Sequence, residues 1–149
     1  MQETSIGSII KSHLSDERVK NAVVVKSKIL EKAACFLRSN GFVELLPTVI
    51  SPITDPLNHE TFSTSINYYD QTYKLTQSMI FHKQLAVTVY EKIFIVSPNV
   101  RFETSEKSES GKHLFEFTQI DLEIRNATRE TIMSLLEDLF VYVLSLIHI

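Results

Sequence analysis

The stretch NVRFETSEKSESGKHLFEFTQIDLEI, Asn99 to Ile124, decides the fold that we expect for this chain. Side chains alternate between the two faces of a β-strand, so the polar residues Asn99, Arg101 and Glu103 share one face. The second half alternates too and places a mostly polar and aromatic set on one face: His113, Phe115, Phe117, Gln119, Asp121 and Glu123. We predict two strands joined by a mobile hairpin loop over 104–112, with one face packed and the other suited to a nucleotide.

Arg101 and Phe117 are the residues of this stretch with the clearest use in nucleotide binding. The planar guanidinium of Arg101 matches phosphate or carboxylate oxygens. The alternative is a salt bridge to a neighbouring strand glutamate, which is Glu103, Glu116 or Glu123. Phe117 is either a core residue, as most phenylalanines are, or an aromatic platform for a base.

Other polar residues allow both a functional and a structural interpretation. Gln119, Asp121 and Glu123 form a row of oxygen-bearing groups that could bind an amino group, a hydroxyl or a hydrated metal, or simply face solvent. His113 has no second His or Cys at a metal-binding spacing, so we expect no zinc site. Lys83 is either a solvated helix lysine or a cation that recognises a carboxylate.

Length and composition limit the class of protein. A chain of 149 residues, 44% of them apolar, is long enough for one domain with a hydrophobic core. The net charge of -3 gives no basic field that would hold nucleic acid without specificity. Cys35, the only cysteine, is expected in the core. We find neither a secretory signal nor a membrane span, and so expect a cytoplasmic protein without a membrane partner.

The pattern of apolar residues and breakers predicts a mixed succession of helices and strands. An amphipathic helix over 16–39, capped by Ser15, ends at Asn40 and Gly41. A long irregular connection between Pro47 and about Ser65 is of the length that is often functional. The other predicted elements are a strand over 42–46, a hairpin of 66–69 and 72–75, a helix from a Ser78 cap to about Tyr90, a strand over 92–97 ended by Pro98, and a helix from about Arg129. We expect the helix after Ser78 to bury its apolar residues Ile80, Leu85, Ala86 and Val89.

The last helix has no stop signal in the sequence. VYVLSLIHI contains no glycine, cationic cap or polar exit, so we interpret residues 1–149 as part of a domain whose C-terminal portion is missing. Residues 145–149 resemble a translated sequencing adapter, and we expect them to be non-native. On this interpretation the 149 residues alone are expected to be inactive.

Three sequence segments together resemble the class II aminoacyl-tRNA synthetases, in their aspartyl and asparaginyl branch. VRFETSEKSESGKHLFEFTQIDLEI is similar to the second motif of that branch, GFVELLPTVISP to the first motif and LTQSMIFHKQL to the aspartate-binding helix. The resemblance implies an α+β fold, an antiparallel β-sheet flanked by helices, that is truncated before the glycine-rich third motif. It also implies a homodimer formed through helix 16–39 and strand 42–46.

The resemblance assigns roles to individual residues. For ATP, Arg101 would contact the α-phosphate, Glu103 the adenine edge, Phe117 the adenine ring and His113 the phosphates. For aspartate, the implied residues are Ser78, Lys83, Gln119 and Asp121, and Glu123 would contact Mg2+ or the ribose. Met79 and Ile80 stand where relatives near the aspartyl enzymes have Pro and Gln, which removes one polar aspartate contact.

The narrower resemblance is to archaeal asparagine synthetases, which are similar to a synthetase catalytic core without its tRNA-binding domain. It implies that aspartate is activated as aspartyl adenylate and that ammonia then gives asparagine, with ATP and Mg2+ as cofactors. One alternative is the N-terminal half of the catalytic domain of an aspartate or asparagine tRNA ligase, for which tRNA would be a partner. A second alternative is a non-catalytic paralogue that binds nucleotide or amino acid.

Overall fold

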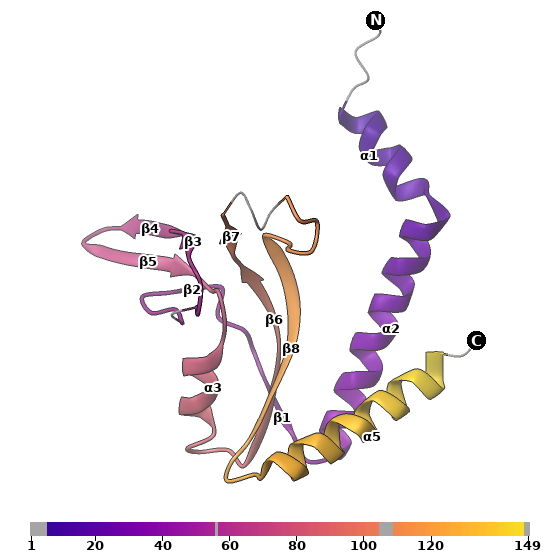
Figure 1. Cartoon of the computed structure of the whole chain (residues 1–149), viewed down its shortest axis with the longest axis vertical. Helices are drawn as coiled ribbons and strands as arrows, with labels where there is room; N and C mark the ends of the chain where they lie inside the picture. The colour runs from indigo at the N-terminus through magenta and orange to yellow at the C-terminus, as the bar shows by residue number, and fades with distance from the viewer. Residues whose placement is uncertain (1–5, 56, 105–108, 148–149) are drawn as a thin grey trace, which may run out of the picture. The chain divides into compact units, whose positions relative to one another are not determined.

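The computed structural model describes residues 6–55, 57–104 and 109–147, and it divides into two compact units (Figure 1). The first unit consists of residues 1–40 and 128–149, and the second of Gly41–Ala127. Helices and mixed sheets confirm the α+β fold. None of the helices within the described ranges is both long and apolar enough to cross a membrane.

The described part of the first unit is helical: α1 is Ile6–Ser15, α2 is Glu17–Ser39 and α5 is Arg129–Ile147. Helix α2 packs against α5, where the rings of Phe36 and Tyr142 lie 5.3 Å apart. Helix α1 was not predicted from the sequence. Helix α5 extends to Ile147, but a helical conformation does not test whether residues 145–149 are native. Their non-native origin stays a prediction.

Two details of α2 correct the sequence analysis. Its N-cap is Asp16, which accepts a hydrogen bond from the Arg18 backbone N–H at 2.8 Å, and not Ser15. Ser15 belongs to α1, and its hydroxyl donates to the Lys11 carbonyl. Cys35 is exposed rather than in the core. The predicted stop is confirmed, because α2 ends at Ser39 and Gly41 has a φ of +83°, which favours glycine.

The described part of the second unit contains three small sheets. The first has the order β1-β6-β8, with β1 (Val43–Leu45) parallel and β8 (Glu116–Ile124) antiparallel to β6 (Lys92–Val100). The second has the order β2-β5-β4, and the third pairs β3 with β7. Their bounds are Ile50–Ser51 for β2, Gln71–Leu75 for β5, Ser65–Tyr68 for β4, Thr61–Phe62 for β3 and Phe102–Glu103 for β7.

The core of this unit is centred on β6. Ile93, Phe94 and Ile95 are each at most 1% exposed, so the middle strand of its sheet is buried on both faces. The predicted hairpin is confirmed as β4 and β5, whose register pairs Tyr68 with Gln71. Figure 1 shows β6 and β8 as the two longest strands, side by side.

Strand β6 continues through Pro98, where the sequence analysis had ended it. The backbone N–H of Val100 donates to the Thr76 carbonyl and therefore points away from β8. N–H groups two residues apart in a strand point the same way. The N–H that Pro98 lacks would therefore also have pointed away from β8. The pairing of Pro98 with Thr118 in β8 is thus retained.

Two other predicted boundaries differ. Strand β8 begins at Glu116, so His113 and Phe115 lie before it, and part of the 104–112 loop, 105–108, lies outside the described residues. Helix α3 is Ile80–Ala86 and ends well before Tyr90, and its N-cap is Met79 without a side-chain hydrogen bond, not Ser78.

Helix α3 also presents a different face from the one predicted. Ile80, Leu85 and Val89, which we expected to be buried, are 39%, 71% and 73% exposed, whereas Lys83 is 8% exposed. A helix that buries its lysine rather than its apolar residues needs a polar partner for that lysine. That partner lies in β8, which α3 contacts.

Truncation of the central core residue should destabilise the protein strongly. We expect Phe94→Ala to lower the free energy of unfolding by about 3–5 kcal/mol, because Phe94 is 1% exposed and leaves a cavity. The matched control is Val89→Ala at a 73% exposed position, expected to change it by less than about 0.5 kcal/mol. Urea unfolding followed by circular dichroism measures both, and equal midpoints would contradict the central position of Phe94 in the core.

Candidate functional site

Arg101 is held at the junction between β6 and β7. Its side-chain Nε donates to the Gln77 carbonyl at 3.0 Å, and its guanidinium carbon lies 5.0 Å from the centre of the Phe117 ring. Its backbone N–H donates to the Phe115 carbonyl at 2.8 Å. Because β6 pairs Asn99 with Phe117, the register itself brings Arg101 close to the Phe117 ring. The hydrogens on its two terminal nitrogens are not used in these contacts.

Arg101 and Phe117 line a cavity of about 220 Å³, which we call the arginine cavity. Its lining residues are Arg101, Glu103, Lys112, His113, Leu114 and Phe117. Four residues expected to bind ATP thus meet at one place. Within the described residues, Arg101 forms no salt bridge to Glu103, Glu116 or Glu123. The alternative interpretation, in which Arg101 pairs with a neighbouring strand glutamate, is therefore not what the structure has.

Glu103 has a different partner, which the sequence analysis missed. His59 lies 44 positions earlier, in the long connection after β2, and its Nε2 lies 3.1 Å and 3.0 Å from the two carboxylate oxygens of Glu103. The Glu103 side chain is only 6% exposed. The signal available in the sequence was the length of that connection, since long connections in compact domains are often functional.

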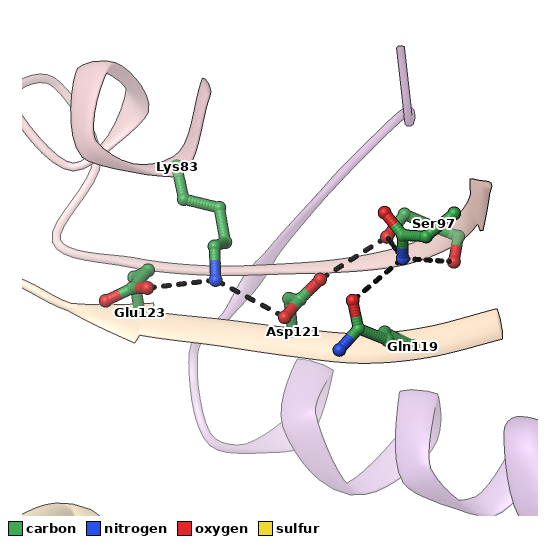
Figure 2. A network of polar contacts seen from close by, with 6 residues as sticks. Lys83, Ser97, Gln119, Asp121 and Glu123 are labelled. Atoms are coloured by element: carbon green, nitrogen blue, oxygen red, sulfur yellow. Dashed lines mark hydrogen bonds and ion pairs between the residues drawn. The ribbon is translucent and has the colours of Figure 1, made fainter. Parts of the chain in front are cut away.

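A second group of polar side chains lies along β6 and β8 and meets Lys83 of α3; we call it the polar network (Figure 2). Its members are Lys83, Ser97, Asn99, Gln119, Asp121 and Glu123. The Lys83 ammonium lies 3.3 Å from Asp121 Oδ1 and 3.1 Å from Glu123 Oε1. Lys83 is therefore not a solvated helix lysine, and it shares its charge between two carboxylates.

Ser97 and Asn99 were not among the expected site residues. Both are fully buried, and they pair with Gln119 and Phe117 in the β6–β8 register, so they face the same side as the row on β8. Ser97 Oγ lies 3.3 Å from Asp121 Oδ2, and Asn99 Nδ2 donates to Gln119 Oε1 at 2.8 Å. The alternation in β6 could have identified them, because a polar residue at a core position needs a partner.

The hydrogen bond from Asn99 determines which atom of the Gln119 amide remains for a ligand. Asn99 Nδ2 also faces the Ser97 carbonyl at 3.4 Å, and a carbonyl can only accept, which supports this assignment of the amide. Gln119 Oε1 is then used inside the polar network, and its Nε2 remains as a donor. A donor suits a substrate oxygen, whereas an ammonium group needs acceptors such as Asp121.

The other expected site residues are His113 and Ser78, and the expected metal contact is Glu123. His113 is exposed and lines the arginine cavity from the segment before β8. Ser78 is half-buried and belongs neither to the lining of that cavity nor to the polar network. Across the described part of the chain no three His, Cys, Asp or Glu side chains gather as metal ligands, and Glu123 faces Lys83. These residues alone do not form a Mg2+ site.

Removal of the Lys83 charge should destabilise the second unit. Lys83→Met leaves Asp121 and Glu123 close together without a cation, and we expect the free energy of unfolding to fall by about 2–3 kcal/mol. The expected loss is smaller than for a fully buried ion pair, because the Glu123 side chain is 37% exposed. Adding Asp121→Asn should recover part of it. Chemical unfolding of the two variants measures this, and additive losses would contradict the ion pairs.

Comparisons with known proteins show the family to which this chain belongs. Residues 9–148 match the family of class II tRNA synthetases (D, K and N). An asparagine–tRNA ligase of Thermococcus gammatolerans is 28% identical over 130 residues, 87% of this chain and 29% of that protein. A lysine–tRNA ligase of Thermosipho melanesiensis is also 28% identical, over 87% of this chain and 25% of its own length. An aspartate–tRNA(Asp/Asn) ligase of Methanoculleus marisnigri is 30% identical, over 85% and 28%.

The fold is also found in a solved structure. Asparaginyl-tRNA synthetase from Pyrococcus horikoshii, complexed with asparaginyl-adenylate, superposes with a TM-score of 0.77 at 23% identity, over 95% of this chain and 32% of that one. The chain spans about a quarter to a third of the length of these relatives. They support the tRNA ligase alternative better than asparagine synthesis, and they confirm the aspartyl and asparaginyl branch. The chain belongs to the class II tRNA synthetases of the D, K and N group.

Proposed function

We propose that this chain is part of the catalytic domain of an aspartate- or asparagine-specific tRNA ligase, and that its site activates the amino acid with ATP. The observation that supports this most directly is Arg101, fixed over Phe117 in the arginine cavity without a carboxylate partner among the described residues. A cation held in this way is suited to a group that becomes more negative during a reaction. The aspartate and asparagine ligases among the relatives supply the class of reaction.

ATP would lie in the arginine cavity. Phe117 offers a ring on which adenine can stack, Glu103 offers a carboxylate for the adenine edge, and Arg101 keeps free donors for the α-phosphate. His113 and Lys112 are exposed and line the same cavity, where they could meet the outer phosphates. Mg2+ would arrive with ATP, because the described residues do not gather as its ligands.

The amino acid would lie beside the polar network. Asp121 is an acceptor for the α-ammonium group, and the Gln119 Nε2 donor faces away from Asn99 and suits an oxygen of the substrate. Lys83 is the cation that an aspartate side chain would meet, in competition with Asp121 and Glu123. Its presence favours aspartate over asparagine, and Ser78 remains an expected contact on the segment before α3.

Activation requires one displacement at phosphorus. An oxygen of the amino-acid carboxylate attacks the ATP α-phosphorus and forms the mixed anhydride, while the bond between the α-phosphorus and the bridging oxygen breaks and pyrophosphate leaves with its electron pair. No protein nucleophile takes part. Arg101 stabilises the added charge on the α-phosphate. A preorganised contact of this kind lowers the activation barrier by about 3 kcal/mol.

The acceptor in the second step is the tRNA under this proposal, since the relatives that the chain matches are tRNA ligases. The complete domain would extend past the 149 residues, in line with the quarter to a third of the relatives that they span. A cytoplasmic location remains a prediction.

We also infer a homodimer through helix 16–39 and strand 42–46. Helix α2 leaves Val23, Val24 and Val25 from 40% to 60% exposed, and Leu46, just after β1, is 92% exposed. Exposed apolar side chains on each of these two elements favour a protein partner. Light scattering with Val24→Glu tests this inference, because a charge at a dimer contact should give monomers.

The test of function uses the product of the complete reading frame that encodes these residues. We expect pyrophosphate exchange that depends on aspartate, with less exchange for asparagine and little for lysine. Charging of tRNA and asparagine formation from ammonia are then measured in parallel. Charging alone supports the ligase, asparagine formation without tRNA favours the asparagine synthetase interpretation, and absence of exchange with every amino acid favours a non-catalytic paralogue.

Arg101→Lys should abolish most adenylate formation. Lysine keeps the charge but not the planar fork, and it cannot reproduce both the contact to Gln77 and two phosphate contacts, so we expect exchange to fall by about 100-fold. Arg129→Lys, at an exposed arginine on α5, is the matched control and should retain activity. Near-normal exchange by Arg101→Lys would refute the role of Arg101.

A further inference from the structure

The connection between β2 and β3 places a histidine against Glu103, a residue of the candidate nucleotide site. His59 stands two residues before Thr61, whose backbone pairs with Glu103 in the β3–β7 ladder. The ladder therefore fixes the His59 backbone close to Glu103, and the side chains meet at 3.0 Å and 3.1 Å. The side chains are 24% and 6% exposed, so water competes little for this contact.

The direction of the hydrogen bond follows from the chemistry of the partners. A carboxylate only accepts, so the hydrogen lies on His59 Nε2 and is shared between both oxygens of Glu103. The other ring nitrogen, Nδ1, lies 3.1 Å from Asn58 Oδ1. Each Glu103 oxygen keeps a further lone pair, so the carboxylate can still accept a hydrogen bond from a ligand.

His59 contacts Glu103 from outside the arginine cavity. Glu103 lines that cavity together with two cationic side chains, Arg101 and Lys112, whereas His59 is not one of its lining residues. Without His59, the Glu103 carboxylate would be a natural partner for either cation, because opposite charges in a shared cavity attract. A salt bridge of that kind would neutralise Arg101 and turn the carboxylate away from a base.

We propose that His59 is a positioning residue of the nucleotide site, which fixes the Glu103 carboxylate as an acceptor for the exocyclic amino group of a 6-aminopurine. The proposal rests on the proposed function, in which Glu103 meets the adenine edge. It adds a determinant of base selectivity that lies in a different segment of the chain from the strands of the site. A 6-oxopurine presents an oxygen at the same position, which a fixed carboxylate repels.

The experiment compares ATP with inosine triphosphate, which has an oxygen in place of the amino group. The complete protein and three variants are used: His59→Leu, which has no donor, His59→Gln, which has one, and Glu60→Gln, an exposed neighbour that serves as control. Binding of each nucleotide is measured by calorimetry, and aspartate-dependent pyrophosphate exchange gives kcat and KM for each. Circular dichroism establishes that the variants are folded.

For His59→Leu we expect the KM and Kd for ATP to rise about tenfold, the effect of one hydrogen bond to a charged group. The Kd for inosine triphosphate should hardly change, so the preference for ATP should fall about tenfold. His59→Gln should keep part of the preference for ATP, and Glu60→Gln should keep all of it. The KM for aspartate should stay unchanged, which a general loss of structure would not allow.

Two results would overturn the proposal. One is an unchanged preference for ATP in a folded His59→Leu protein, whether or not its overall activity is lower. The other is the absence of any preference for ATP in the unaltered protein. The proposed function fails separately: if no amino acid supports exchange but ATP binding is selective and loses selectivity in His59→Leu, the ligase is rejected while the role of His59 stands.

Discussion

The antiparallel pairing of β6 with β8 is the constraint on which the candidate site depends. In its register Ile95 lies opposite Asp121, Ser97 opposite Gln119 and Asn99 opposite Phe117. Paired residues of antiparallel strands share a face, so one register places the aromatic ring and the polar network on the same surface. A slip of β8 by one residue would turn Phe117, Gln119 and Asp121 to the opposite face. Hence the polar network and the base platform depend on the same backbone hydrogen bonds.

The polar network shows why helix α3 has its unusual orientation. Burial of a lysine costs free energy unless a carboxylate accompanies it, and here two carboxylates of β8 do so. The helix gives up the burial of Leu85, which is 71% exposed, to place Lys83 over β8. Such an arrangement is weak evidence of stability, since apolar residues would pack there at lower cost. It is better explained by a need for charge at this position, as in an amino-acid site.

Sequence reasoning succeeded where short-range patterns decide the outcome. The alternation over 116–124, the long helix that ends at Asn40 and the β4–β5 hairpin could all be predicted, because each depends on periodicity or on a local breaker. It failed at Pro98 and at α3, where partners distant in sequence decide: the Thr76 carbonyl faces the outer side of β6, and Asp121 attracts Lys83. His59 was missed for the same reason, since no local pattern shows that it meets Glu103.

The distribution of charge explains why Arg101 is left to act on a ligand. Glu103 lies in β7, two residues after Arg101, and lines the same cavity, so it could have neutralised the guanidinium. His59 binds Glu103 instead, from a different segment of the same unit. A carboxylate that already has a partner gains less from moving toward a second cation. The guanidinium, held by a neutral carbonyl and an aromatic ring, therefore keeps its charge for an anion.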